Sequence, residues 1–323
     1  MKIVVTGGAG FIGSNFILYW IKRHPKDEIL NIDKLTYAAN LDNLLEVAKA
    51  KNYKFIKGDI ADKELIHNNV KDADVIVNFA AESHVDNSIK DSTSFIRSNI
   101  EGVHALLEAS KEFGIRLHQV STDEVYGSLA LNSKAKFSRK TPYNPRNPYS
   151  ATKASADFLV RAYYNTYKIP VTISNCSNNY GPNQHPEKLI PKAILNALAG
   201  KQIPVYGSGM QVRDWIYVED HCTGIERVLE KGELGSTYLF GGNNERSNIE
   251  VVKYILKKLD KDENLIKHVE DRPGHDVRYA IDWLESEKEL NWKPGYSFGE
   301  GMDLTIKHYI KNKEKYSASV TGA

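Results

Sequence analysis

Short apolar runs alternate with amphipathic stretches along the first half of the chain. The runs are four to six residues long and contain several β-branched residues, which is typical of strands buried on both faces of a parallel sheet. We place these strands at 2–6, 28–32, 53–57, 74–78, 117–120 and 170–175. Helical periodicity predicts helices after residue 13, at 62–70, at 92–113 and at 151–167. Strands that alternate with helices in this way predict a doubly wound parallel α/β sheet with helices on both faces.

The alternation becomes less regular from residue 185 onward. We place helices near 189–198, 222–229, 249–259 and 300–311, and strands at 203–206 and 236–240. A chain of 323 residues exceeds the size at which a single core usually stops growing. We therefore expect one lobe from residues 1–180, with parts of the later chain returning to it, and a smaller, interleaved α/β lobe mainly from residues 181–323.

Composition narrows the possible partners. The 43 basic and 41 acidic residues are interspersed, without a basic stripe, so we expect no nucleic-acid partner. No run approaches the roughly 20 apolar residues of a membrane span, and the glycine-rich start does not resemble a signal peptide. Cys176 and Cys222 have no metal-ligand spacing. We expect a cytoplasmic protein with reduced cysteines, no metal and no membrane contact.

A glycine-rich turn, residues 7–13, follows the first strand. Its glycines fit both GxGxxG and GxxGxxG, and they allow the backbone to approach a pyrophosphate at the start of the next helix. Asp33 ends the second strand twenty residues later, where its carboxylate would bind the adenosine ribose hydroxyls and repel a 2′-phosphate. This Rossmann-type unit favours NAD over NADP. Two alternatives to this interpretation exist. The glycines could serve helix–strand packing alone, and Asp33 could be a turn residue.

Two further segments carry reactive side chains. Residues 121–127 follow the fifth strand and contain Asp123 and Glu124, and both acids can reach a ligand only if the chain has left the strand there. Tyr149 and Lys153 are four residues apart, so they share one face of a helix. Two acids, a phenol and an ammonium suit an enzyme that moves protons and hydride. Alternatively, Asp123 and Glu124 are two solvated carboxylates of a loop.

The glycine turn and the Tyr149-x-x-x-Lys153 pair resemble the extended short-chain dehydrogenase/reductase family over essentially the whole chain. Within that family, four segments are similar to the nucleotide-sugar 4,6-dehydratases, namely 33–38, 81–86, 121–127 and 272–276. Related epimerases typically have small or hydroxylic residues in place of Asp123 and Glu124. One departure lies in the polar loop 129–148, which we expect to be a connection or a lid: Arg139 and Lys140 stand where acidic residues are common in the family.

The resemblance implies a reaction in three stages. Tyr149 would take the proton of the carbon 4 hydroxyl while hydride leaves for NAD, with Thr122 bonded to the carbon 4 oxygen. Lys153 would lower the pKa of the phenol and hold the nicotinamide ribose. Glu124 would then remove the carbon 5 hydrogen, and Asp123 would protonate the departing carbon 6 hydroxyl. Hydride would finally return to carbon 6, so that the tightly bound NAD is regenerated.

The resemblance also implies binding residues and partners. Cofactor contacts are expected at Gly7, Gly10, Phe11, Ile12, Gly13, Asp33, Lys34, Leu35, Thr36, Asp59, Ile60, Ala80, Ala81, Glu82, Ser83, Ser98, Tyr149, Lys153 and Asn179. Nucleotide-sugar contacts are expected at Ser83, His84, Thr122, Asn178, Lys188, Leu189, Ile190, Pro191, Lys192, Ala193, Pro204, Val205, Tyr206, Arg213, Asn248, Asp271, Arg272, Pro273, Gly274 and His275. The implied substrate is dTDP-glucose, in deoxysugar biosynthesis such as that of rhamnose, and the implied assembly is a homodimer.

Other interpretations remain open at this point. Asp59 could cap the helix at 62–70 instead of contacting the adenine. Arg213 could be a surface charge paired with Asp214, although its guanidinium fork suits a diphosphate. A dehydratase of another nucleotide sugar or a 4-epimerase would share the fold, and a cofactor-binding regulatory protein without turnover would share the glycine turn. The paired acids argue against an epimerase, which expels no water.

Overall fold

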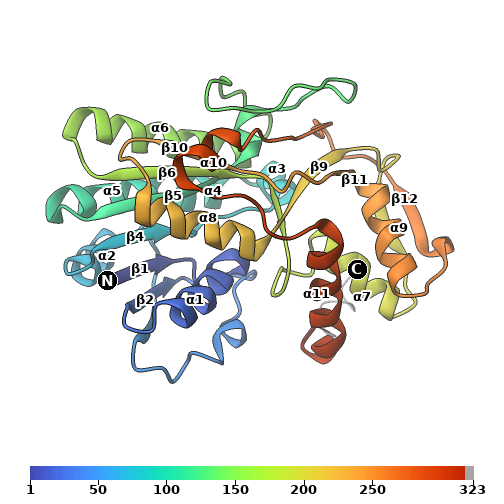
Figure 1. The fold of residues 1–323 in the computed structure, drawn as a ribbon, viewed down its shortest axis with the longest axis horizontal. Helices are drawn as coiled ribbons and strands as arrows, with labels where there is room; N and C mark the ends of the chain where they lie inside the picture. The colour runs from blue at the N-terminus through green and yellow to red at the C-terminus, as the bar shows by residue number, and fades with distance from the viewer. Residues whose placement is uncertain (317–323) are drawn as a thin grey trace.

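A central parallel sheet of seven strands organises the computed structural model, which describes residues 1–316 (Figure 1). From one edge to the other the order is β10-β6-β5-β4-β1-β2-β3. The strands are β1 (Lys2–Thr6), β2 (Glu28–Asp33), β3 (Tyr53–Lys57), β4 (Val75–Asn78), β5 (Arg116–Thr122), β6 (Val171–Cys176) and β10 (Thr237–Phe240). The order reverses between β1 and β4, which is where doubly wound sheets bind their ligands. The predicted fold class is confirmed.

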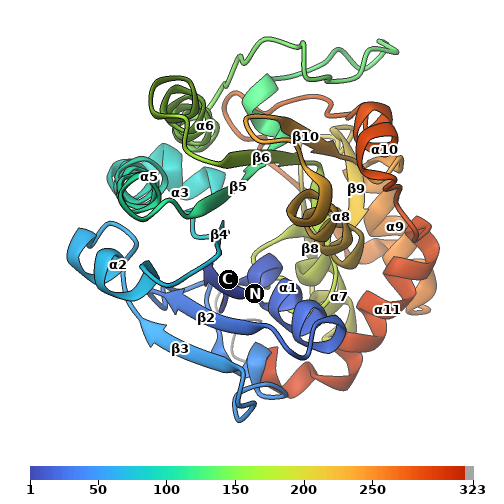
Figure 2. The same ribbon diagram turned by 60° about the vertical axis from the view of Figure 1, so that its left-hand side comes forward.

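Helices cover both faces of this sheet, as Figure 2 shows in a view along it. One face carries α2 (Lys63–Val70), α5 (Gly102–Phe113) and α6 (Pro148–Tyr167), and the other carries α1 (Phe11–Arg23) and α8 (Val218–Lys231). Successive strand residues point to opposite faces. Ile3 and Val5 accordingly pack with Phe16 of α1, whereas Val4 packs with Leu106 of α5. Burial on both faces explains why the strands are nearly continuous apolar runs.

The helix expected at 92–113 is divided by a π-helical turn. It comprises α4 (Thr93–Ile96), the π turn Arg97–Glu101 and α5. Asn99 projects from the π turn and bonds the backbone of Glu82 twice: its Oδ1 accepts from the Glu82 N–H at 2.9 Å and its Nδ2 donates to the carbonyl at 3.1 Å. The π turn therefore holds the segment that follows β4 in place.

A second lobe packs around its own core and lies beside the carboxyl edge of the large sheet (Figure 1). Its helices are α7 (Leu189–Leu198), α9 (Asn248–Lys258) and α11 (Phe298–Lys311). Its two small sheets contain β7 (Asn178–Tyr180), β9 (Val212–Tyr217) and β11 (Glu245–Ser247), and β8 (Ile203–Tyr206) with β12 (Ile266–Val269). Two short helices, α3 (Val85–Lys90) and α10 (Leu284–Leu290), and the 3₁₀ turns Leu41–Leu44, Asp123–Tyr126, Glu263–Leu265 and Lys313–Tyr316 complete the described elements. The part of this lobe expected beyond residue 316 lies outside the described residues.

The loop 129–148 is attached to the C-terminal part of the chain. Phe137 is buried and forms a β-bridge with Ile281. Arg139 forms ion pairs with Glu285 at 2.9 Å and Glu289 at 2.5 Å on α10. The basic residue that departs from the family pattern thus has acidic partners of its own in this chain.

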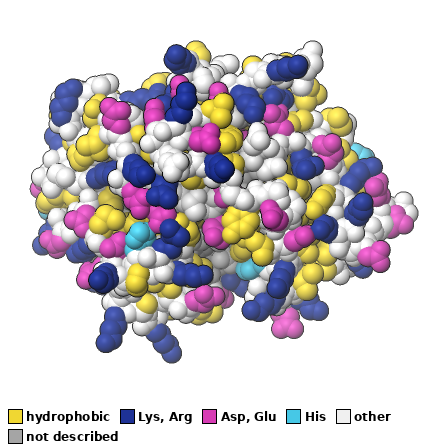
Figure 3. Space-filling view, viewed as in Figure 1, with side chains coloured by type: hydrophobic (Ala, Val, Ile, Leu, Met, Phe, Trp, Pro, Cys, Tyr) yellow, Lys and Arg dark blue, Asp and Glu magenta, His cyan; other side chains and the backbone are white. Residues whose placement is uncertain are grey.

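The surface carries both charge signs without a large field of either. Figure 3 shows Lys and Arg side chains interspersed with Asp and Glu over the visible face. Within residues 1–316, none of the helices combines the length and apolarity needed to cross a membrane.

Candidate active site

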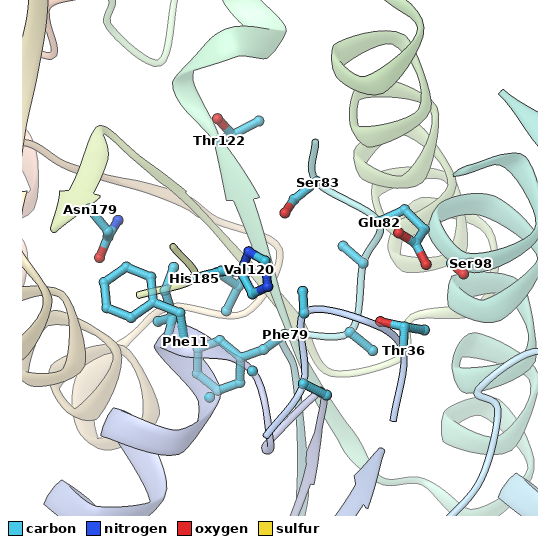
Figure 4. A pocket seen from close by; sticks show the side chains of 18 of the residues that line it. Phe11, Thr36, Phe79, Glu82, Ser83, Ser98, Val120, Thr122, Asn179 and His185 are labelled. Carbon is cyan, nitrogen blue, oxygen red and sulfur yellow. The ribbon is translucent and has the colours of Figure 1, made fainter. Parts of the chain in front are cut away.

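Two adjoining cavities lie where the strands of the large sheet end. The first has a volume of about 310 Å³ and follows the ends of β1, β2, β4 and β5, and the second, of about 420 Å³, extends toward the smaller lobe. The residues that line both cavities are Ser83, Glu124, Asn178, Asn179, Gln184, Glu187 and Lys188. Because they share these walls, a ligand in one cavity can meet a ligand in the other. In Figure 4, Phe11 and Phe79 lie at one end of the first cavity and Thr122 lies at the other.

The glycine turn is shaped by close backbone contacts. Gly7 has a φ of +71°, and a Cβ there would lie 2.6 Å from the Ala80 nitrogen. A Cβ on Gly13 would lie 2.4 Å from the Gly7 carbonyl oxygen. Helix α1 begins with Gly10 as its N-cap, with no side-chain cap and no acidic residue in its first turn. Its first N–H groups therefore remain available for an anion, as a dinucleotide pyrophosphate requires.

Asp33 fastens the glycine turn to the end of β2. Its Oδ1 accepts from the Leu35 N–H at 2.8 Å and its Oδ2 accepts from the Ala9 N–H at 2.9 Å. Burial raises the pKa of this carboxyl, and the two backbone hydrogen bonds oppose that shift. Each oxygen keeps a lone pair for a ribose hydroxyl, so the residue fits the adenosine ribose of NAD.

Asp59 does not cap helix α2, which was the alternative considered for it above. The cap of α2 is Asp62, whose side chain accepts from the Leu65 N–H. Asp59 forms ion pairs with Lys34 at 2.9 Å and Arg97 at 3.2 Å, and it lines the first cavity. The capping interpretation of Asp59 is therefore wrong.

Most expected cofactor residues line the first cavity. Of the nineteen positions, the exception is Leu35, which instead adopts a φ of +58° beside Asp33. The cavity wall also includes residues that the sequence did not single out: Ile32, Ala38, Ala39, Gly58, Phe79, Val120, Ser121, Cys176, Ser177, Gln184, His185 and Glu187. Half of them are the last residue of a predicted strand or directly follow one, which is the signal that could have indicated those six.

The paired acids lie in a 3₁₀ turn directly after β5. The Thr122 hydroxyl caps this turn by accepting from the Glu124 N–H at 3.3 Å. The chain has thus left the strand at Asp123, as access of both acids to a ligand requires. Asp123 lines the first cavity, and Glu124 lines both.

Tyr149 and Lys153 reach the same cavity from the first turns of α6. The helix begins at Pro148, three residues earlier than expected, because Asn147 and Ser150 form a capping box around its start. Both side chains are buried and line the cavity. Lys153 Nζ donates to the Val120 carbonyl at 2.8 Å.

The surroundings of Asp123 and Glu124 shift the pKa values of the two carboxyl groups to different extents. Burial raises the pKa of Asp123 well above its usual value, and the neighbouring charges of Glu124 and Asp214 raise it further. Burial also raises the pKa of Glu124, but the positive charge of Arg213 opposes that shift. Asp123 is 1% exposed, and its Oδ2 has no hydrogen-bond partner among the described residues. Arg213 opposes the shift in both acids, and because the upward shift is the larger one for Asp123, the pair holds a proton preferentially on Asp123.

The pKa of the Tyr149 phenol shifts in the direction opposite to the one expected. Burial raises its pKa well above the usual value, and the charge of Glu124 adds to this. Lys153 does not reverse the shift, because its ammonium bonds the Val120 carbonyl and burial lowers its own pKa. The expectation that Lys153 leaves the phenol with a lowered pKa is wrong for the protein alone.

Two arginines stand on the wall of the second cavity. Arg213 is buried, stacks 4.3 Å from the ring centre of Tyr279, and donates to the carbonyl of Asp276 at 3.0 Å. Its neighbour Asp214 instead accepts from the Asn244 N–H, which argues against the surface ion pair. Arg272 pairs with Asp86 of α3 at 2.7 Å.

Sixteen of the twenty expected nucleotide-sugar positions line the second cavity. Thr122 lines the first one instead, and Pro191 and Ala193 of α7 are buried and line neither cavity. Asp271 lies outside both cavity walls and accepts from Gln211 Nε2 at 2.9 Å. Additional wall residues that the sequence did not indicate include Val85, Asp86, Asn147, Trp215, Val269, Asp276 and Tyr279.

Comparisons with known proteins agree with this geometry. The family model described as GDP-mannose 4,6 dehydratase matches residues 4–305. The dTDP-glucose 4,6-dehydratase of Mycobacterium tuberculosis (strain H37Rv) is 48% identical over 97% of this chain and 94% of its own length. That of Escherichia coli is 46% identical over 100% and 97%.

Solved structures give the same result. The dTDP-glucose 4,6-dehydratase of Bacillus anthracis, crystallised with NAD, has a TM-score of 0.93 and 47% identity over 98% of this chain and 99% of that one. The Streptomyces venezuelae enzyme of the same name, with NAD and a second ligand, has a TM-score of 0.94 and 42% identity over 98% of both chains. The resemblance predicted from the motifs is confirmed, and the chain belongs to the GDP-mannose 4,6 dehydratase family.

Proposed function

We propose that the chain is an NAD-dependent dTDP-glucose 4,6-dehydratase, a hydro-lyase that forms dTDP-4-dehydro-6-deoxy-glucose and water. The carrying observation is the pair Asp123 and Glu124, placed where a cavity that fits NAD meets one that fits a nucleotide sugar. Relatives and structural neighbours of that name, two of them crystallised with NAD, support the proposal.

The redox steps are assigned to α6. Bound NAD supplies the chemistry of accepting a hydride from carbon 4 and returning it to carbon 6. Tyr149 takes the proton of the carbon 4 hydroxyl, and Thr122 holds the same oxygen by a hydrogen bond. Because burial raises the pKa of the phenol, its ionised form needs a nearby cation, and Lys153 offers one from the next turn of the helix.

The loss of water is assigned to the 3₁₀ turn after β5. Once carbon 4 is a ketone, the carbon 5 hydrogen is acidic, and Glu124 removes it as general base and gives a proton back to carbon 5 when carbon 6 receives the hydride. Asp123 donates a proton to the carbon 6 hydroxyl, which then leaves as water. The raised pKa of Asp123 keeps this proton available at neutral pH.

The second cavity is assigned to the nucleotide. Arg213, which is buried, and Lys188, whose side chain is 33% exposed, are cations on its wall and suit the diphosphate. Residues 1–180 together with β10 form the NAD-binding lobe in this proposal, and residues 181–323 form mainly the nucleotide-sugar lobe.

We propose a cytoplasmic homodimer in the biosynthesis of a deoxysugar such as rhamnose. Helix α6 exposes Phe158 by 55% and Tyr167 by 48%, and apolar side chains of this size favour a helix-to-helix contact between two copies. Light scattering of the purified protein tests the dimer, and a monomeric mass would contradict it.

The activity is tested by incubating the protein with dTDP-glucose and following the 4-keto-6-deoxy product by alkaline absorbance and NMR. UDP-glucose serves as the control for the nucleotide. Formation of dTDP-galactose alone would indicate an epimerase, and an unchanged sugar would indicate a binding protein without turnover. Either result would overturn the proposed function.

A further inference from the structure

A carboxyl that the mechanism does not use lies directly beneath the proposed catalytic residues. Asp157 follows Lys153 by one turn of α6, is fully buried, and lies outside both cavity walls. Its Oδ2 accepts from the Ser121 hydroxyl at 2.7 Å, the Tyr143 hydroxyl at 2.9 Å and Asn175 Nδ2 at 3.4 Å. A side chain that only filled space in the core would not need three hydrogen-bond donors on one buried oxygen.

The directions of these hydrogen bonds identify Asp157 as an ionised acceptor. Arg161 donates to the Tyr143 oxygen at 2.8 Å, so the hydroxyl proton of Tyr143 is free to point at Asp157. Asn175 uses its oxygen to accept from the Tyr126 hydroxyl at 3.4 Å, which leaves its NH₂ for Asp157. Every partner of Oδ2 is therefore a donor, as a carboxylate requires. Burial raises the pKa of Asp157, and the charge of Lys153 with the hydrogen bonds of Ser121 and Tyr143 opposes that shift and favours the ionised form.

The same groups hold the end of β5. Ser121 immediately precedes the proposed catalytic turn, and Asn175 Nδ2 also donates to the Thr122 carbonyl at 3.1 Å. Lys153 Nζ donates to the Val120 carbonyl at 2.8 Å. Asp157 thus contacts Ser121 of β5 directly and the Thr122 carbonyl through Asn175, and Lys153 lies one helical turn before it on α6.

We propose that Asp157 is a positioning residue for the reaction: its carboxylate fixes the end of β5 that carries the paired acids and serves as the buried counter-charge of Lys153. This inference rests on the proposed function, because it assigns Asp157 a part in that reaction. It predicts that one buried charge affects both the redox steps and the loss of water.

Charged and titratable groups face this carboxylate from every neighbouring element. Lys153 and Arg161 lie on α6, Tyr143 on the loop and Tyr126 on the 3₁₀ turn. Burial lowers the pKa of Lys153, and the charge of Asp157 opposes that shift. Removing the Asp157 charge should lower the pKa of Lys153 further, so the ammonium should be lost at lower pH.

The test compares three variants with the unmodified protein. Asp157→Asn keeps the shape and removes the charge. Tyr143→Phe removes one donor and leaves the carboxylate, so it serves if Asp157→Asn does not fold. Glu226→Gln is the matched control: Glu226 is also a buried carboxylate that accepts from a tyrosine and an arginine, but it lies on α8 away from both cavities.

The readouts are kcat and KM for dTDP-glucose from pH 6 to 10, with the melting temperature of each variant. For Asp157→Asn we expect kcat to fall about 10- to 100-fold, the effect of a small misplacement of reacting groups. KM should stay within about twofold, since no expected nucleotide contact changes, and the alkaline limb of the kcat profile should move to lower pH. Tyr143→Phe should lower kcat in the same direction by less, and Glu226→Gln should lower only the melting temperature.

An unchanged kcat and pH profile in Asp157→Asn, or in Tyr143→Phe if the first variant does not fold, would overturn the inference. A fall in kcat with an unmoved alkaline limb would overturn the counter-charge role. If the unmodified protein does not convert dTDP-glucose, the proposed function fails instead, and the two failures are therefore distinguishable.

Discussion

In the proposed reaction the two acids act on different atoms, so their roles can be separated experimentally. In Asp123→Asn the amide keeps the shape of the side chain but has no acidic proton to give. Glu124 and the redox residues are unchanged, so oxidation at carbon 4 and removal of the carbon 5 hydrogen should continue. Loss of water should slow, because the carbon 6 hydroxyl would have to leave without a donated proton.

The size of the effect follows from the burial of the acid. General acid catalysis contributes about 10²- to 10⁴-fold, which corresponds to about 3–5 kcal/mol in the activation barrier. Asp123 is 1% exposed, and Oδ2 has no partner among residues 1–316, so no neighbouring side chain stands ready to replace it as donor. We therefore expect the upper half of this range for the elimination rate.

The assay uses dTDP-glucose in D₂O with NMR detection of deuterium at carbon 5 and of the 4-keto-6-deoxy product. Asp123→Asn should incorporate deuterium into unreacted sugar at a rate within about tenfold of the unmodified protein, while product formation falls far more. Glu124→Gln should lose both signals. Equal losses of exchange and elimination in Asp123→Asn, or elimination at the normal rate, would refute the division of roles.

Three further predictions concern the phenol, the glycine turn and a buried histidine. Tyr149→Phe should lower turnover at least about 10²-fold, measured by product formation. The purified variant should keep its NAD, measured as the nucleotide released on denaturation. Normal turnover would exclude Tyr149 as the base. Gly13→Ala should cost about 1–3 kcal/mol in urea unfolding, because its Cβ would lie 2.4 Å from the Gly7 oxygen, whereas Gly10→Ala, at 3.2 Å, should keep the fold; equal stability of both variants would contradict this. Burial lowers the pKa of His221 to about 3 from 6.5, so the unfolded chain binds the extra proton and stability is lost as pH falls below about 6.5, by about 2 kcal/mol at pH 5. His221→Gln should flatten the pH dependence of the urea midpoint, and an unchanged slope would show that the histidine is not responsible.

The regular part of the fold could be predicted because one physical pattern determines it. Strands buried on both faces are continuous apolar runs, so β1 and β3 were predicted with their observed bounds. Elements without such a pattern were missed. β7 has three residues, and α3 has six with one buried side chain, which is too little sequence to show a period.

The site was predictable to the extent that its residues follow strand ends or known motifs. The glycine turn, Asp33 and the Tyr149–Lys153 pair are contiguous signals of that kind. The second cavity is different, since its wall brings Asp86 together with Tyr279 through tertiary contacts that no local pattern reveals. The protonation of Tyr149 was also mispredicted, because burial outweighs the helical spacing from which the effect of Lys153 was inferred.

The edge strand β10 has a consequence for how the chain is made. It pairs in parallel with β6, from Thr237–Ile173 to Phe240–Cys176, yet about sixty residues, most of them in the other lobe and the rest in and around α8, are translated between the two strands. A ribosome therefore exposes β6 before the strand that covers it exists, and unpaired edge strands invite association between chains. A fragment truncated after residue 180 should aggregate for the same reason. An isolated cofactor-binding unit of this protein would need β10 grafted back behind β6.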